Sequence, residues 1–167
     1  MLDLKKIKYL CSDTMKPYLD EISIGEDTRT FCEQYIPWLI NPSFFEYESL
    51  VILNFPQIDN HAVNWKQEII NEGAAVYVEW DSNHIDGLNR YIPNIGIKAQ
   101  RNVAFFVYNT LKYELKKRYP NYTFQIVLSY DDEFHIFHLR FYRCRDYEPV
   151  MVTDANIFIS PMLAEII

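Results

Sequence analysis

The strongest constraint on the fold is a pair of alternating apolar and polar stretches separated by a short acidic run. Every second residue of the stretch 122–130 is apolar or aromatic, which is the period of a half-buried β-strand. Residues 131–133 are all acidic and predict a turn, and residues 134–144 return with apolar side chains on both faces, as in a central strand. The sequence therefore predicts an antiparallel hairpin over residues 122–144.

The clearest helical pattern comes directly before this hairpin, over about residues 99–118. The positions that recur at the helical period predict one buried face, and they are Val103, Phe106, Val107, Thr110, Leu111 and Leu115. Basic residues gather near the end of the pattern, where the helix dipole favours positive charge, and Tyr119-Pro120 ends it. We interpret this basic cluster as a solvated helix end rather than a nucleic-acid site.

The first part of the chain, residues 1–45, has a broken helical pattern. Apolar residues recur at the helical period over residues 4–11 and 15–22, and a third helical stretch ends at Pro37. The sequence therefore predicts three short helices in this part.

The middle part, residues 46–98, predicts a strand, a helix, a second strand and a long loop. Residues 49–55 and 74–80 are rich in strand formers, and an amphipathic helix between them ends before Gly73. Residues 81–98 are polar and form the longest predicted loop.

Together these patterns predict an α+β fold with a single domain over residues 1–167. Helices are expected to pack on one face of a mixed, largely antiparallel sheet that ends in a C-terminal β-meander. The last part, residues 99–167, supplies the long helix, the hairpin and a final strand at about residues 150–159.

The composition is that of an ordinary globular chain and disfavours several function classes. Of 167 residues, 49% are apolar and 23% are charged, so the whole chain should fold around one core. The net charge of −7 repels polyanions, and no direct nucleic-acid binding is expected. No stretch approaches the roughly 20 apolar residues that span a bilayer, so no membrane contact is expected either.

Targeting and cysteine patterns indicate a cytoplasmic protein. The first residues show no signal-peptide pattern. Cys11, Cys32 and Cys144 are widely spaced and contain no C-x-x-C pair, which argues against a disulfide framework or a zinc knuckle. We therefore expect reduced thiols in a reducing compartment.

Recognised catalytic and cofactor signatures are absent from the sequence, including the P-loop, the dinucleotide-binding glycine pattern, the nucleophile elbow and H-E-x-x-H. No cofactor is expected. His135 and His138 form an H-x-x-H pattern, but strand residues three apart point to opposite faces, so no metal site is predicted. We expect one of the two to hydrogen bond within a face that carries Arg140 and Tyr142.

One candidate site is the segment after the second predicted strand, which combines carboxylates with a histidine. The residues are Asp81, His84 and Asp86. Histidine beside aspartate can act as a general base, and loops after strand ends often carry function. An alternative hypothesis is therefore a small hydrolase or transferase that uses this loop, joined by a histidine or arginine from the hairpin. A deep pocket with convergent polar groups would favour it.

The other candidate site is the acidic turn of the hairpin, which is made of Asp131, Asp132 and Glu133. Small size, net negative charge, thirteen tyrosines and no catalytic motif favour a non-enzymatic protein-binding or inhibitory module that docks on a basic partner. We assign partner binding to this turn together with Asp81, His84 and Asp86. In composition and size the chain resembles bacterial immunity and antitoxin proteins, and that resemblance implies a toxin nuclease as the partner.

Overall fold

The computed structural model describes residues 8–47, 49–54, 79–80, 82–146, 148 and 150–167. In chain order, the elements are β1 (Tyr9–Cys11), α1 (Lys16–Asp20), α2 (Glu26–Tyr35), α3 (Pro37–Ile40), β2 (Phe44–Tyr47), β3 (Leu50–Leu53), η1 (Leu88–Arg90), α6 (Ile97–Arg118), β4 (Thr123–Asp131), β5 (Ile136–Cys144), η2 (Ala155–Ile157) and β6 (Met162–Ile166).

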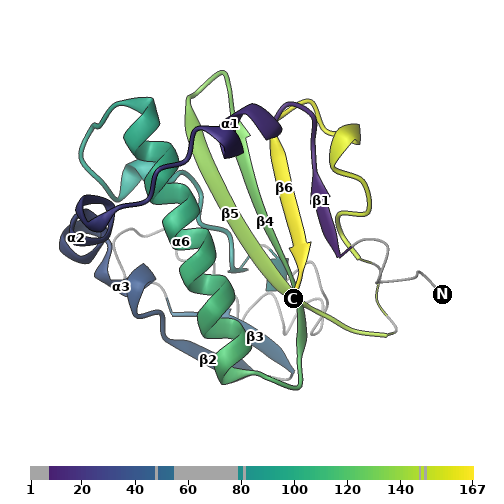
Figure 1. Ribbon diagram of the computed structural model, residues 1–167. Helices are drawn as coiled ribbons and strands as arrows, with labels where there is room; N and C mark the ends of the chain where they lie inside the picture. The colour runs from purple at the N-terminus through teal and green to yellow at the C-terminus, as the bar shows by residue number, and fades with distance from the viewer. Residues whose placement is uncertain (1–7, 48, 55–78, 81, 147, 149) are drawn as a thin grey trace.

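The strands of the described residues form two antiparallel sheets. The larger sheet has the strand order β1-β6-β4-β5, and the smaller one is the β2-β3 hairpin. Figure 1 shows the four-stranded sheet behind α6, with β2 and β3 below it. This arrangement confirms the predicted α+β class.

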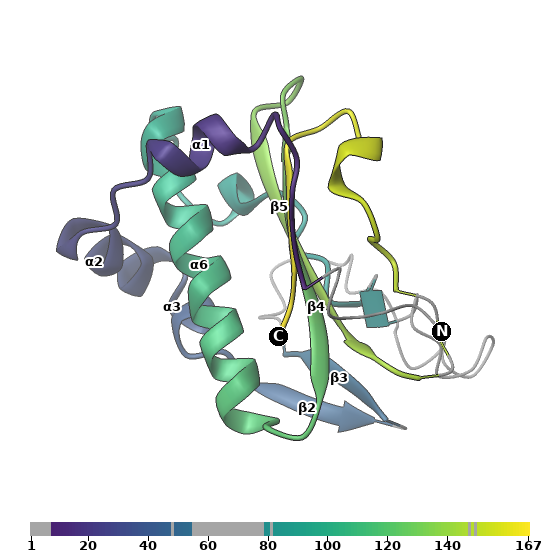
Figure 2. The same cartoon turned by 45° about the vertical axis from the view of Figure 1, so that its right-hand side comes forward.

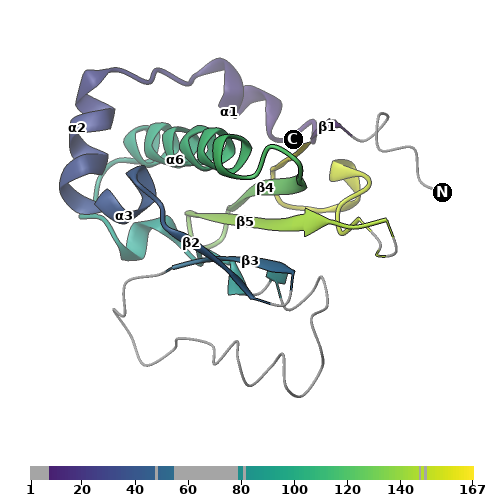
Figure 3. The ribbon, with the colours of Figure 1, turned by 90° about the horizontal axis from the view of Figure 1, so that it is seen from below.

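Helix α6 covers one face of the four-stranded sheet, and α1, α2 and α3 lie on the same side (Figures 2 and 3). Its buried face packs on the inward side chains of β4 and β5. The apolar residues that α6, β4 and β5 contribute to this core include Val103, Val107, Leu111, Leu115, Phe124, Ile126, Leu128, Phe137, Leu139 and Phe141. Lys112 of α6 also pairs with Glu165 of β6 at 2.6 Å, which ties the helix to the middle of the sheet.

The opposite face of the sheet is covered by the segment between β5 and β6, seen on the right in Figure 2. A smaller cluster forms there from Val127, Val152, Ala155, Met162 and Ala164. This face carries the remaining side chains of β5, so the strand separates a dry core on one side from a mixed polar surface on the other.

The predicted hairpin is confirmed. Strands β4 and β5 pair from Thr123 opposite Cys144 to Asp131 opposite Ile136, with the acidic run in the turn. The long helix is also confirmed and begins at Ile97. Helices α1 and α2 match the second and third predicted helices, and β3 matches the strand predicted at 49–55 over its described part.

Three sequence predictions were wrong over the described residues. Residues 9–11 form strand β1 because they pair with β6, where the helical period had predicted a helix. Glu79 and Trp80 are helical rather than extended, since the amide of Asn83 bonds back to the carbonyl of Glu79. The last strand begins at Met162 rather than near residue 150.

The displaced start of the last strand has a local cause. The side chain of Asp154 accepts a hydrogen bond from the amide of Asn156, which starts the short helix η2 in the middle of the predicted strand. The next three residues, Ile157, Phe158 and Ile159, are 68%, 39% and 97% exposed. The helix predicted before Gly73 and residues 74–78 of the second predicted strand lie outside the described residues.

A buried carboxylate joins the two sheets. Glu79 is fully buried, and its side chain accepts hydrogen bonds from the amide of Val51 in β3 at 2.6 Å and from the amide of Arg143 in β5 at 2.8 Å. The guanidinium of Arg145, whose side chain is 3% exposed, lies 3.0 Å away. One turn later, Asn83 bonds the carbonyl of Val51 and the amide of Leu53. Glu79 and Asn83 together therefore hold β3 beside β5.

Among the described residues, no helix has both the length and the apolar character needed to cross a membrane.

We predict that Glu79→Ala lowers the free energy of unfolding by about 3–5 kcal/mol, because it leaves a buried guanidinium and two strand amides without their acceptor. Urea unfolding followed by circular dichroism measures the change. Glu33→Ala is the control, because Glu33 forms an exposed pair with Arg29 and its loss should cost less than about 1 kcal/mol. Equal losses in the two variants would contradict the role given to Glu79.

Candidate functional site

A short antiparallel bridge brings the predicted loop site onto strand β5. The amide of Ile85 bonds the carbonyl of Leu139 at 2.8 Å, and the amide of Leu139 bonds the carbonyl of Ile85 at 3.2 Å. Both side chains are fully buried. Antiparallel register then places residue 84 opposite 140 and residue 86 opposite 138. The polar neighbours of Ile85 therefore meet those of Leu139.

The carboxylate of Asp86 is the centre of the resulting cluster. Its Oδ1 lies 2.9 Å from Nδ1 of His138 and 3.9 Å from Nε2 of His84, and its Oδ2 lies 3.0 Å from Nη1 of Arg90. The contact with His138 is close but not collinear, so Nδ1 is buried without an aligned hydrogen bond within the described part of the chain.

The imidazole of His84 is fixed from the other side by Arg140. Nη2 of Arg140 lies 3.0 Å from Nδ1 of His84, and the same guanidinium stacks over the ring of Trp80 at 5.1 Å. Burial and then the charge of Arg140 lower the pKa of His84 to about 4, against the opposing effect of Asp86. At neutral pH, His84 is therefore uncharged.

An open pocket lies beside this cluster, at the start of β5 where the acidic turn ends. It is lined by Asp86, Arg90, Asp131, Phe134, Ile136 and His138. The carboxylate of Asp131 accepts hydrogen bonds from the amides of Glu133 and Phe134, which shapes the turn. Phe134 is 66% exposed at the rim. The fold therefore brings the acidic turn and the loop site to one pocket.

The other predicted residues lie in different places. Asp132 accepts a hydrogen bond from the hydroxyl of Tyr18 at 3.2 Å, and Glu133 is exposed. Asp81 lies outside the described residues. His135 ends the turn with a φ of 56°, and its Nδ1 lies 2.9 Å from the hydroxyl of Tyr130. His135 precedes β5 and so is not the strand residue that was expected, and the two histidines have different partners, Tyr130 for His135 and Asp86 for His138.

Sequence reasoning identified His84 and Asp86 but not their partners. One of the two histidines, His135 or His138, was expected to hydrogen bond within a face that carries Arg140 and Tyr142. The hypothesis of a hydrolase included a histidine or arginine from the hairpin. What was missing was the register, because the buried Ile85 gives no sign that it pairs with Leu139. Arg90 was not singled out, although its spacing four residues after Asp86 suits a local ion pair.

The positions of His84, Asp86 and His138 show whether the cluster suits a metal ion. Ligand atoms of His84, Asp86 and His138 all lie within 4.8 Å of one another. However, a guanidinium can only donate, so Nδ1 of His84 must accept from Arg140 and the ring proton must be on Nε2. In a metal-bound histidine, the N–H of the second ring nitrogen normally donates a hydrogen bond to an acceptor. Two arginines next to the cluster also disfavour a cation there.

Comparisons with protein-family models, with curated proteins and with solved structures give no significant match.

The lowered pKa of His84 predicts a loss of stability in acid. The unfolded chain takes up the proton near pH 6.5 and the folded chain only near pH 4, so stability present above about pH 6.5 is lost as the pH falls toward 4. His84→Asn keeps an acceptor for Arg140 and does not titrate. Between about pH 7.5 and 4.5, the unfolding free energy of the wild type should fall by about 2 kcal/mol more than that of the variant. Parallel curves in urea titrations at the two pH values would contradict this.

We also predict that the protein purified without chelator contains no stoichiometric zinc. If Nε2 of His84 bound a metal, Nδ1 would carry the proton and would need an acceptor, but Nδ1 faces the donor Arg140. Elemental analysis by mass spectrometry measures the zinc content. About one zinc per chain, lost in His138→Gln and retained in His135→Gln, would show instead that His84, Asp86 and His138 bind a metal.

Proposed function

We propose that this chain is a protein-binding or inhibitory module of the immunity or antitoxin type, which docks on a basic partner through the acidic turn and the adjoining pocket. The observation that carries the proposal is that Asp131 of the turn and Asp86 of the loop line the same pocket, although they are far apart in the sequence. The acidic turn and the loop with Asp86 were assigned to partner binding separately from the sequence.

The charge of this surface suits a basic partner. Asp132 and Glu133 project from the turn beside Asp131, and the chain as a whole carries a net charge of −7. Exposed charges at the rim of an interface chiefly raise the association rate and make it depend on salt. The turn is therefore expected to steer a basic protein toward the pocket.

The aromatic contact at this surface comes from Phe134 rather than from tyrosine. Among the described residues, the most exposed tyrosines are Tyr9, Tyr35 and Tyr113, which belong to β1, α2 and α6 and not to the turn. Phe134 follows directly after the acidic run and is 66% exposed. An exposed aromatic ring next to carboxylates can anchor the aliphatic stem of a lysine or the guanidinium of an arginine.

The proposal places this interaction in the cytoplasm. All three cysteines are free thiols. Burial raises the pKa of Cys32 and of Cys144 to about 12, so neither is a reactive thiolate at neutral pH. Unpaired, unreactive thiols suit a reducing compartment.

The test begins with a partner captured by the wild-type protein and identified by mass spectrometry. Asp132→Asn with Glu133→Gln removes two rim charges and leaves Asp131, which shapes the turn. We predict that association measured by stopped-flow fluorescence slows by up to about 10-fold at low salt and depends less on ionic strength. Dissociation should change little. Phe134→Ala should instead speed dissociation.

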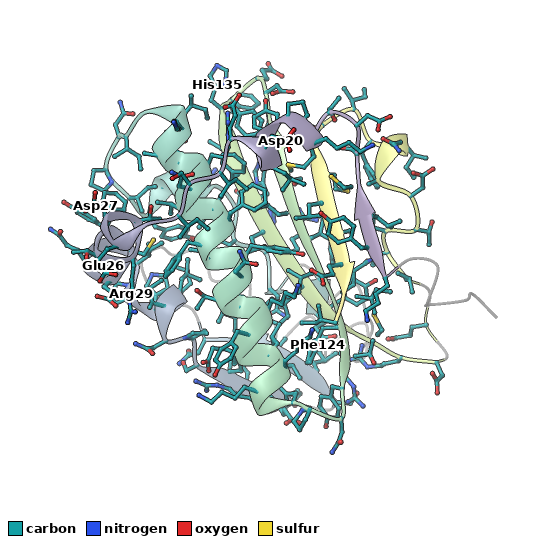
Figure 4. The ribbon with its side chains drawn as sticks, in the orientation of Figure 1. Asp20, Glu26, Asp27, Arg29, Phe124 and His135 are labelled. Atoms are coloured by element: carbon teal, nitrogen blue, oxygen red, sulfur yellow. The ribbon has the colours of Figure 1, made fainter. Side chains whose placement is uncertain are left out.

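The matched control removes the same charge elsewhere. Glu26 and Asp27 are exposed on α2, and Figure 4 shows them away from His135 at the turn. Glu26→Gln with Asp27→Asn changes the net charge equally and should leave most of the association rate intact. If the two double variants slow association equally, net charge acts alone and the turn is not the docking surface.

A further inference from the structure

The cluster around Asp86 contains an arrangement that docking does not require. Three donor groups converge on one carboxylate, with His138 and His84 on the side of Oδ1 and Arg90 on Oδ2. The side chain of Asp86 is 42% exposed and those of both histidines are 20% exposed. A structural ion pair needs one partner, whereas here three side chains surround one carboxylate at the wall of a pocket.

The contacts assign the ring protons of the two histidines. Arg140 can only donate, so His84 accepts on Nδ1 and carries its proton on Nε2. Nδ1 of His138 lies beside the carboxylate of Asp86, which favours a proton on that nitrogen. The two neighbouring rings, whose centroids are 5.5 Å apart, therefore carry their protons on opposite nitrogens.

This assignment leaves a basic nitrogen facing the pocket. Nδ1 of His138 is buried, yet the side chain lines the pocket, so the edge that reaches the pocket is the one that carries Nε2. With the proton on Nδ1, Nε2 has its lone pair available. A histidine whose other nitrogen is oriented by a carboxylate is the usual form of a general base. The bent contact with Asp86 does not exclude this role, because catalytic hydrogen bonds often align only when substrate binds.

We propose that His138 is a general base for the hydrolysis of a small carboxylic ester, with Asp86 as its positioning residue. Nε2 of His138 takes a proton from a water molecule while the water oxygen bonds to the carbonyl carbon of the ester. The bond from that carbon to the alcohol oxygen then breaks, and the proton passes from His138 to the departing alcohol. The products are a carboxylic acid and an alcohol.

The lining of the pocket indicates the substrate class. Phe134 and Ile136 offer an apolar wall for the acyl or alcohol group. Arg90 is 64% exposed and held beside the site by Asp86, so its remaining donors can bind the carbonyl oxygen as that oxygen gains negative charge. This activity goes beyond the proposed docking function and does not depend on it.

The test uses 4-nitrophenyl acetate as the substrate, with release of 4-nitrophenol followed by absorbance. His138→Gln should lower kcat/KM by about 100-fold or more, and Asp86→Asn should lower kcat more than it raises KM. His135→Gln is the matched control, because it removes a histidine at the nearby turn that takes no part in the cluster. Equal rates for His138→Gln and the wild type would overturn the proposal, and circular dichroism shows that each variant is folded.

Two further measurements distinguish general-base catalysis from direct attack by the imidazole. If His138 takes a proton from water, the reaction is slower in D2O, whereas unchanged rates would mean that imidazole attacks the ester directly and would overturn the proposed step. Long-range proton–nitrogen NMR should show the proton of His138 on Nδ1 and that of His84 on Nε2. In Asp86→Asn the preference of His138 for Nδ1 should weaken. His138 protonated on Nε2 in the wild type would also overturn the proposal.

Discussion

The hydrogen bonds to the carboxylate of Glu79 are the interaction on which the arrangement of the two sheets depends. Taking a carboxylate out of water is costly, and burial raises the pKa of Glu79 to about 7 against the opposing effects of Arg145 and of the amides of Val51 and Arg143. That cost is offset only because one donor comes from β3 and another from β5, so the group is satisfied only when the two strands lie together. The interaction therefore adds specificity to the arrangement, since apolar packing alone would tolerate many placements of the small hairpin against the large sheet.

The candidate site follows from the same anchored segment. After the turn held by Glu79, the chain reaches Ile85, whose two backbone bonds to Leu139 fix the register against β5. A shift by one residue would turn His84 and Asp86 away from their partners, because side chains alternate along a strand. The pocket and the acidic turn are also neighbours for a simple reason, since Asp131 and His138 occupy the same face of the hairpin close to its turn. Under the two proposals, a protein bound at the turn would cover the pocket, and the partner and the ester would compete for one surface.

The sequence predicted best those features that depend on local periodicity. The hairpin and α6 could be recognised because the period of two and the helical period are each sustained over many residues. Strand β1 was missed because three residues are too few to show a period. It is a strand because it pairs with β6, which is distant in the sequence. Two residues of the cluster, His84 and Asp86, were singled out from the sequence because they are close together in it. Their contact with His138 depends on the bridge between Ile85 and Leu139, which no local pattern reveals. Pairing between distant segments is a tertiary property, and one sequence carries little information on it.

The pairing of β1 with β6 has a consequence for the order of folding. The hydroxyl of Ser12, next to β1, accepts a hydrogen bond from the amide of Met162 across a sequence separation of 150 residues. Strand β6 also lies between β1 and β4, so β1 has no place in the sheet until β6 has been added. Closing so long a loop is entropically unfavourable and contacts of this kind slow folding. During synthesis, the hairpin and α6 can therefore assemble while β1 is still unpaired. The sheet is complete only after β6 has left the ribosome and paired with both β1 and β4.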